Sequence, residues 1–133
     1  MPTFDISTGR FSKLDKGLWL CRLKAGRLEL GDAVAGIEFL IQHKATSKVL
    51  VLVDARELNS ISKEARRYYS TDSTVEELHA ALAFLVSSAV SRMVVRFFVK
   101  LTSMPVPIEI FTDEDHAIEW LRGHLPSVNE KTI

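Results

Sequence analysis

The chain has 133 residues, the length of one domain, and its 17 basic and 17 acidic residues cancel to a formal net charge of zero. Apolar residues make up 47% of the sequence, which excludes a disordered tail, while the neutral balance argues against a dedicated nucleic-acid-binding protein. Cys21 is the single cysteine, so a disulfide scaffold is excluded and a reducing compartment is indicated. We therefore expect one domain over residues 1–133, with its core over about residues 11–125.

The sequence carries no segment typical of export or membrane insertion. Residues 1–10 lack the apolar run of a signal peptide. The longest uncharged stretch, residues 78–91, is shorter than the roughly 18 residues that span a bilayer. We expect a cytoplasmic protein without a membrane span.

The first predicted elements are a hairpin and a helix. Residues 17–24 alternate as a half-buried strand does, and residues 11–15 are the expected partner strand, with the turn at Lys16 and Gly17. A helical pattern then runs over residues 32–44, with Asp32 as the expected N-cap.

The middle of the chain predicts two buried strands. Residues 48–54 contain an unbroken run of valine and leucine between a lysine and an aspartate, which is typical of a central strand covered on both faces. Residues 58–62 are expected to be a loop, and Ser62 is the expected cap of a short helix that carries Ala65 and Tyr69. Residues 78–86 contain the second buried strand.

Residues 90–101 are ambiguous. Arg92, Arg96 and Lys100 lie four residues apart and would share one face of a helix, but all three are even-numbered and would also share one face of a strand. Periodicity therefore leaves both readings open, and the length of the segment favours a helix.

The end of the chain predicts a strand and a helix. Prolines at positions 105 and 107 interrupt the preceding element, and residues 108–111 form a short strand. A helix follows with Thr112 as the expected N-cap and Pro126 as its stop. Strands that alternate with helices predict an α/β fold: a single-layer, mixed, mostly parallel sheet flanked by helices.

Several of these stretches resemble a known superfamily. The strand at residues 49–54 and the loop at residues 55–62 resemble the middle strand and following loop of STAS domains, which include the bacterial anti-anti-sigma factors. Residues 97–101, 107–111 and 117–121 resemble the end of small bacterial proteins of the SpoIIAA-like, or STAS/CRAL-TRIO-like, group. The resemblance implies a sheet of four or five strands and a helix at residues 90–101.

The resemblance also implies a regulatory serine. Partner-switching STAS domains carry a phosphorylatable serine at the start of the helix that follows the middle strand, and Ser62 is the nearest match, with Ser60 second. This sequence departs from the usual Asp-Ser-small pattern, because Ile61 precedes Ser62 and Lys63 follows it. A plain N-cap is the alternative role of Ser62.

Two further groups are candidate binding residues. Asp54 lies at the carboxyl end of the central strand, where ligand sites gather in open α/β sheets, and its alternative role is to cap the following loop. A second group combines positive charge with aromatic rings and could meet an acidic partner surface, a phosphorylated ligand or anionic lipid; its members are Arg92, Arg96, Lys100, Phe97 and Phe98. The alternative for this group is an ordinary surface helix with basic side chains over apolar neighbours.

The sequence predicts no catalytic residues, metal site or cofactor. His116 and His124 are eight residues apart, too far to share a metal on one helix turn, and the six glycines form no phosphate-binding loop. Charge is unevenly placed, since residues 10–27 are basic and residues 109–119 are acidic, which suggests a polar surface for a partner.

Two functions are therefore open, neither of them enzymatic. One is a regulatory module that docks a protein partner through loops and helices at the carboxyl ends of the strands, and the other is a carrier of a small apolar or amphipathic ligand held between the sheet and residues 90–101. A closed face under Phe97 and Phe98 would favour the first and an open apolar cavity the second. An enzyme built on Asp54 is a third, weaker option, and a homodimer or peripheral membrane contact is expected if apolar side chains of residues 90–101 are exposed.

Overall fold

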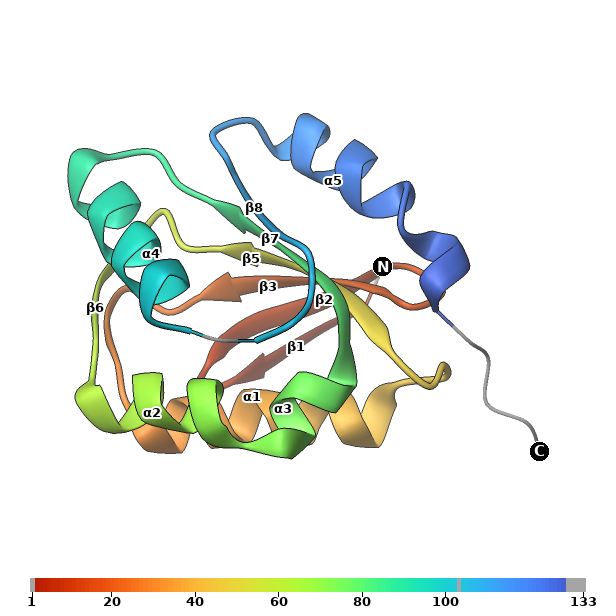
Figure 1. Cartoon of the computed structure of the whole chain (residues 1–133), viewed down its shortest axis with the longest axis horizontal. Coiled ribbons are helices and arrows are strands. Elements are labelled where there is room, and N and C mark those ends of the chain that lie inside the picture. Colours follow the sequence, from red (N-terminus) through yellow and green to blue (C-terminus); the bar gives the residue numbers. More distant parts are fainter. Residues whose placement is uncertain (1, 103, 129–133) are drawn as a thin grey trace.

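A six-stranded sheet in the order β1-β2-β3-β5-β7-β8 forms the middle layer of the computed structural model, which describes residues 2–102 and 104–128 (Figure 1). The strands are β1 (Thr3–Ile6), β2 (Gly9–Asp15), β3 (Leu18–Leu23), β5 (Val49–Asp54), β7 (His79–Leu85) and β8 (Ile108–Phe111). Strands β3, β5, β7 and β8 are parallel, whereas β1, β2 and β3 are antiparallel. The predicted fold class is confirmed, and the sheet exceeds the expected four or five strands because β1 pairs with the outer edge of β2.

Helices cover both faces of this sheet. They are α1 (Leu30–His43), α2 (Lys63–Thr71), α3 (Ser73–Leu78), α4 (Ala89–Leu101) and α5 (Glu114–Arg122), followed by the short 3₁₀ helix η1 (Leu125–Ser127). The side chains of α1 to α4 join one apolar cluster, and those of α5 join a second cluster on the opposite face. Figure 1 shows α5 on the far side of the sheet from α1, α2 and α3.

The valine and leucine run of β5 explains how one strand serves both clusters. Val49 and Val51 point into the cluster beneath α1 to α4, while Leu50 and Leu52 point into the cluster beneath α5. All four side chains are buried. The prediction of a central strand covered on both faces is confirmed.

The ambiguous segment is a helix. Val95 and Phe98 of α4 are buried against the sheet, whereas Met93 and Phe97 are exposed. A strand would have placed the odd-numbered side chains on one common face, and here Val95 and Phe97 lie on opposite sides. The implication of the family resemblance is confirmed, and the strand reading is excluded.

Helix boundaries differ from the expected ones at three places. Glu29, not Asp32, is the N-cap of α1; Asp32 is the third helical residue, and its carboxylate accepts a hydrogen bond from the Glu29 backbone N–H. Asp113, not Thr112, caps α5, because its carboxylate accepts from the His116 N–H. That helix ends at Arg122, before Pro126, with Gly123 as its C-cap. Short polar residues were thus recognised as cap candidates, but their position was wrong by one to three residues.

The expected loop at residues 58–62 is wrong. Residues Leu58–Ile61 form strand β6, which pairs in parallel with β4 (Gly26–Leu28) as a separate two-stranded sheet. Neither strand is long enough to show a local alternation, and the pairing joins residues about thirty positions apart. The small sheet brings the start of α2 next to the end of β4, since the Ser62 N–H donates to the Leu28 carbonyl at 2.9 Å.

Within residues 2–102 and 104–128, none of the helices has the length and apolar character needed to cross a bilayer.

Candidate functional site

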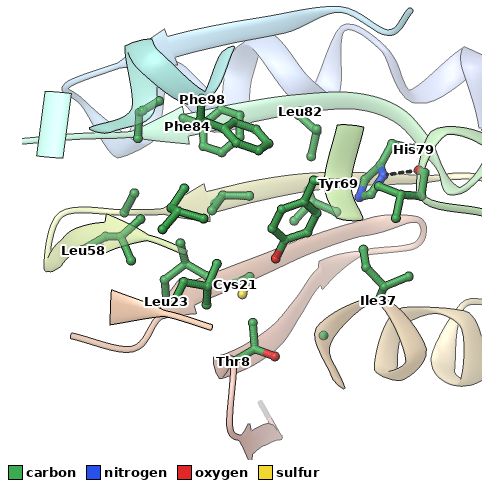
Figure 2. A pocket seen from close by; sticks show the side chains of 18 of the residues that line it. Thr8, Cys21, Leu23, Ile37, Leu58, Tyr69, His79, Leu82, Phe84 and Phe98 are labelled. Carbon is green, nitrogen blue, oxygen red and sulfur yellow. Dashed lines mark hydrogen bonds between the residues drawn. The ribbon is translucent and has the colours of Figure 1, made fainter. Parts of the chain in front are cut away.

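An apolar cavity of about 80 Å³ lies between the sheet and helices α1, α2 and α4. Its walls come from β3, β5 and β7 on the sheet side and from Ile37, Tyr69, Val95 and Phe98 on the helix side. Figure 2 shows Ile37, Tyr69 and Phe98 among the side chains that surround this space from separate elements. This apolar space lies under Phe98, so the criterion for a small-ligand site is met on the inner side of α4, while the exposed outer side of the same helix offers a separate surface to a protein partner.

Polar atoms at this cavity are few. The Thr8 hydroxyl donates to the Asp32 carbonyl, and His79 Nδ1 lies 2.8 Å from the Val75 carbonyl oxygen. Tyr69 also lines the cavity, and Figure 2 shows its hydroxyl directed toward Cys21 and Thr8. Tyr69 is held by an edge-to-face contact with Phe98, with ring centroids 5.6 Å apart. Tyr69 and His79 therefore offer hydrogen-bonding groups at an otherwise apolar wall.

The outer face of α4 is a second candidate surface. Six large hydrophobic side chains are exposed in the described part of the chain, and four of them lie on this helix: Val90, Met93, Phe97 and Leu101, with Leu30 and Ile41 elsewhere. Met93 is 65% exposed and Phe97 50%. Surface leucines and valines scattered singly are ordinary, but a row along one helix marks an interaction surface.

Basic side chains border this apolar row. A shallow groove on α4 is lined by Ala89, Arg92, Met93, Arg96, Phe97 and Lys100. The guanidinium of Arg66, from α2, lies over the Phe97 ring at 5.1 Å from its centroid, a cation–π contact that holds the ring in place. The structure thus brings together the predicted residues Arg92, Arg96, Lys100 and Phe97, and separates them from Phe98, which faces the cavity.

Ser62 is a buried helix cap. Its side chain has no solvent exposure, and its Oγ accepts a hydrogen bond from the Ala65 N–H at 3.1 Å. The N-cap role is therefore confirmed. A kinase would need α2 to open before it reached this hydroxyl, whereas Ser60 lies half-buried on β6. Phosphorylation at either serine stays a prediction.

Asp54 is the centre of an ion-pair network at the carboxyl edge of the sheet. Its carboxylate accepts hydrogen bonds from the Arg22 side chain at 2.6 Å and from the Arg56 side chain at 2.9 and 3.0 Å, and also from the Arg56 backbone N–H at 3.1 Å. Burial alone would raise its pKa, but the bonds from Arg56 and Arg22 outweigh burial and hold the pKa below the ordinary 3.8. The loop-capping role is supported, and an enzyme built on Asp54 stays a prediction.

We expect Asp54→Asn to lower the free energy of unfolding at neutral pH by about 2 kcal/mol, because the strong charge-assisted bonds are lost while both arginines remain partly solvated. Because the folded pKa is depressed, this stabilisation is present above pH 3.8 and is lost as the pH falls through the folded value. Urea unfolding at pH 7 measures the change. The control is Asp5→Asn, which breaks the exposed pair with Arg10 and should leave the midpoint unchanged; equal effects for both would contradict a special role for Asp54.

The two oppositely charged segments meet each other. Arg22, in the basic hairpin, bonds Glu114 at the start of α5 at 3.2 Å, and Arg122 bonds Asp15 at 3.0 Å. Only the first pair joins a base of residues 10–27 to an acid of residues 109–119, since Asp15 is the acid within the basic segment and Arg122 follows the acidic one. A polar surface for a partner at these segments stays a prediction.

One of the two functions left open by the sequence placed an apolar ligand between the sheet and residues 90–101, where this cavity lies, but the polar groups of the cavity were missed. Tyr69 was identified only as a residue of a short helix, and His79 was not a candidate functional residue. The cavity is lined by residues from most elements of one layer, so no local spacing could reveal it. The sequence does carry one indication that His79 is buried, because His79 is the first residue of the apolar strand β7.

Two solved structures are similar to this chain over most of its length. An uncharacterized protein of the DUF3478 family with a SpoIIAA-like fold, from Shewanella loihica PV-4, is 18% identical, with a TM-score of 0.60 over 84% of this chain and 90% of that chain. The anti-sigma factor antagonist SpoIIAA in its unphosphorylated form is 17% identical, with a TM-score of 0.54 over 85% of this chain and 96% of that chain. At this identity the likeness shows the fold, and it confirms the predicted resemblance to SpoIIAA-like proteins.

Sequence comparison identifies a family. No curated protein matches the chain. A family model described as a domain of unknown function, DUF7793, matches residues 12–125, which include every strand of the main sheet except β1 and the first residues of β2. The chain therefore belongs to the DUF7793 family.

Proposed function

We propose that the protein is a regulatory binding module that docks a protein partner through the outer face of α4. The observation that carries this proposal is the exposed apolar row of that helix, with Met93 and Phe97 at its middle. A soluble domain rarely leaves such a row open to water without a partner to cover it. The cytoplasmic location expected from the sequence is compatible with this role and stays a prediction.

The charges around the row determine the kind of partner. Arg92, Arg96 and Lys100 are exposed along one side of it, and Arg66 covers the Phe97 ring from α2. Basic residues at the rim of an apolar strip are complementary to a partner surface with an apolar centre and acidic residues around it. We infer that the partner is a protein with such an acidic rim.

The experiment begins with a photocrosslinker, p-benzoylphenylalanine, in place of Met93 in the cells that produce the protein. The partner identified from the crosslink is then produced separately, purified and titrated against the chain without the photocrosslinker. We expect Phe97→Asp to weaken this complex at least about tenfold, because a central aromatic anchor is lost, and we expect rising ionic strength to weaken it further.

The matched control is Ile41→Asp, which places the same charge at an exposed apolar position on α1 and should leave the complex unchanged. Both variants should unfold at the wild-type urea concentration, since neither side chain is part of the core. Three results would overturn the proposal: a complex that survives Phe97→Asp, a dimer of this chain that the same substitution dissolves, or binding of the row to vesicles of anionic lipid instead of a protein.

A further inference from the structure

We propose that the cavity beneath α4 is a binding site for a small, neutral molecule with an apolar body and one hydroxyl group. This site is separate from the docking row, because Phe98 and Val95 line the cavity while Met93 and Phe97 face the outside of the same helix. The proposal does not depend on the docking function.

The size of the space limits the ligand. The cavity measures about 80 Å³. A water molecule takes a share of about 30 Å³ in the liquid, and an engineered apolar cavity of about 150 Å³ holds benzene. The space in this protein is therefore larger than one water needs and smaller than a benzene-binding cavity, which fits a ligand with a short aliphatic body.

The lining excludes a charged ligand. Aliphatic and aromatic side chains dominate the wall, among them Val51, Leu82 and Phe84, and none of the described lining residues is an aspartate, glutamate, lysine or arginine. An isolated carboxylate or ammonium group is strongly disfavoured in such surroundings because no opposite charge is present. An alkane or a neutral alcohol carries no such penalty.

Two polar groups in the cavity lining favour the binding of an alcohol over the binding of an alkane. Burial raises the pKa of the Tyr69 phenol, so its hydroxyl stays protonated and can donate. Burial lowers the pKa of His79 to about 4, so the imidazole is neutral at pH 7. Its Nδ1 proton is directed at the Val75 carbonyl, which leaves Nε2 as an acceptor, on the side of the ring away from that carbonyl (Figure 2). A ligand hydroxyl group can accept a hydrogen bond from Tyr69 or donate one to His79, whereas an alkane can do neither.

The experiment is a titration of the ¹⁵N-labelled full chain at pH 7, followed by amide chemical shifts. The probes are 1-propanol, its isomer ethyl methyl ether, which accepts but cannot donate, and the propionate anion; xenon reports the apolar space alone. We expect saturable shifts around β3, β5 and β7 with 1-propanol and xenon, binding of ethyl methyl ether about fivefold weaker than 1-propanol, and no saturable shift with propionate.

Variants separate the apolar space from its polar groups. Tyr69→Phe should weaken the binding of 1-propanol about fivefold and leave xenon binding unchanged. Cys21→Met should abolish binding of both probes, because its longer side chain occupies the cavity, whereas Cys21→Ser keeps the size of the side chain and should retain both. If Cys21→Met does not fold, Ala55→Leu fills the same space from the loop after β5.

Each part of the proposal has its own contrary result. Absence of saturable shifts with 1-propanol and with xenon would show that the cavity is not a binding site. Equal affinity of wild type and Tyr69→Phe for 1-propanol, or saturable binding of propionate, would overturn the assignment of a neutral hydroxyl ligand. None of these results bears on the crosslinking experiment with Met93.

Discussion

Acidification from pH 6.5 to pH 4 should remove about 3 kcal/mol from the free energy of unfolding, through His79 alone. This side chain is 5% exposed, and burial lowers its pKa from 6.5 to about 4. Below pH 6.5 the unfolded chain binds a proton that the folded chain does not accept until about pH 4. Between these values the unfolded state carries more protons, so stability falls as the pH falls, by about 1.4 kcal/mol per pH unit.

Urea unfolding at half-unit steps from pH 7.5 to pH 4 tests this expectation. The comparison is His79→Gln, whose amide can still donate to the Val75 carbonyl but does not titrate. The variant should be less stable at pH 7, because the fit of the ring is lost, and should show a much flatter pH dependence than the wild type. Parallel curves for the two proteins would show that His79 is not the group responsible. The contribution of Asp54 begins only below pH 3.8 and lies outside this window.

Local sequence patterns predicted the parts of the fold in which one residue run determines both structure and burial. Strand β5 is the clearest case, since only a strand covered on both faces accommodates an unbroken run of valine and leucine. The α4 segment was predicted as a helix from its length and from the family resemblance, because the spacing of Arg92, Arg96 and Lys100 fits a helix and a strand equally well. The exposure of Met93 and Phe97 on either side of buried Val95 shows the helix only once the structure is known.

Features that arise from pairing between distant segments could not be predicted in this way. Strands β4 and β6 are three and four residues long, and neither carries a pattern of its own. Arg22 on β3 bonds Asp54, which lies 32 positions later in the chain. The same arginine also bonds Glu114, which lies 92 positions after it. The cavity depends on how three helices meet one sheet, so it follows from packing and not from any single spacing.

Gly9→Ala should destabilise the fold by about 3 kcal/mol or more. Gly9 opens β2 opposite Leu23 with a φ of +150°, a conformation that residues with a side chain rarely adopt. A Cβ atom at this position would lie 2.0 Å from the Arg22 carbonyl oxygen and 3.0 Å from the Leu23 Cα. Both neighbours are backbone atoms of β3, so no side-chain rotation can relieve the overlap, and the start of β2 must move away from β3.

Gly31→Ala is the matched control. Gly31 lies in the first turn of α1, and a Cβ atom there meets no neighbour within 4 Å, so the same substitution should stabilise the chain by up to about 1 kcal/mol through helix propensity. Urea unfolding of both variants at pH 7 gives the two free energies directly. Opposite signs are expected, and a Gly9→Ala protein as stable as wild type would show that β2 has another way to begin. The adjacent Thr8 lines the cavity and holds the Asp32 carbonyl of α1. A displaced β2 should therefore also weaken xenon binding, which the Gly31→Ala protein should retain.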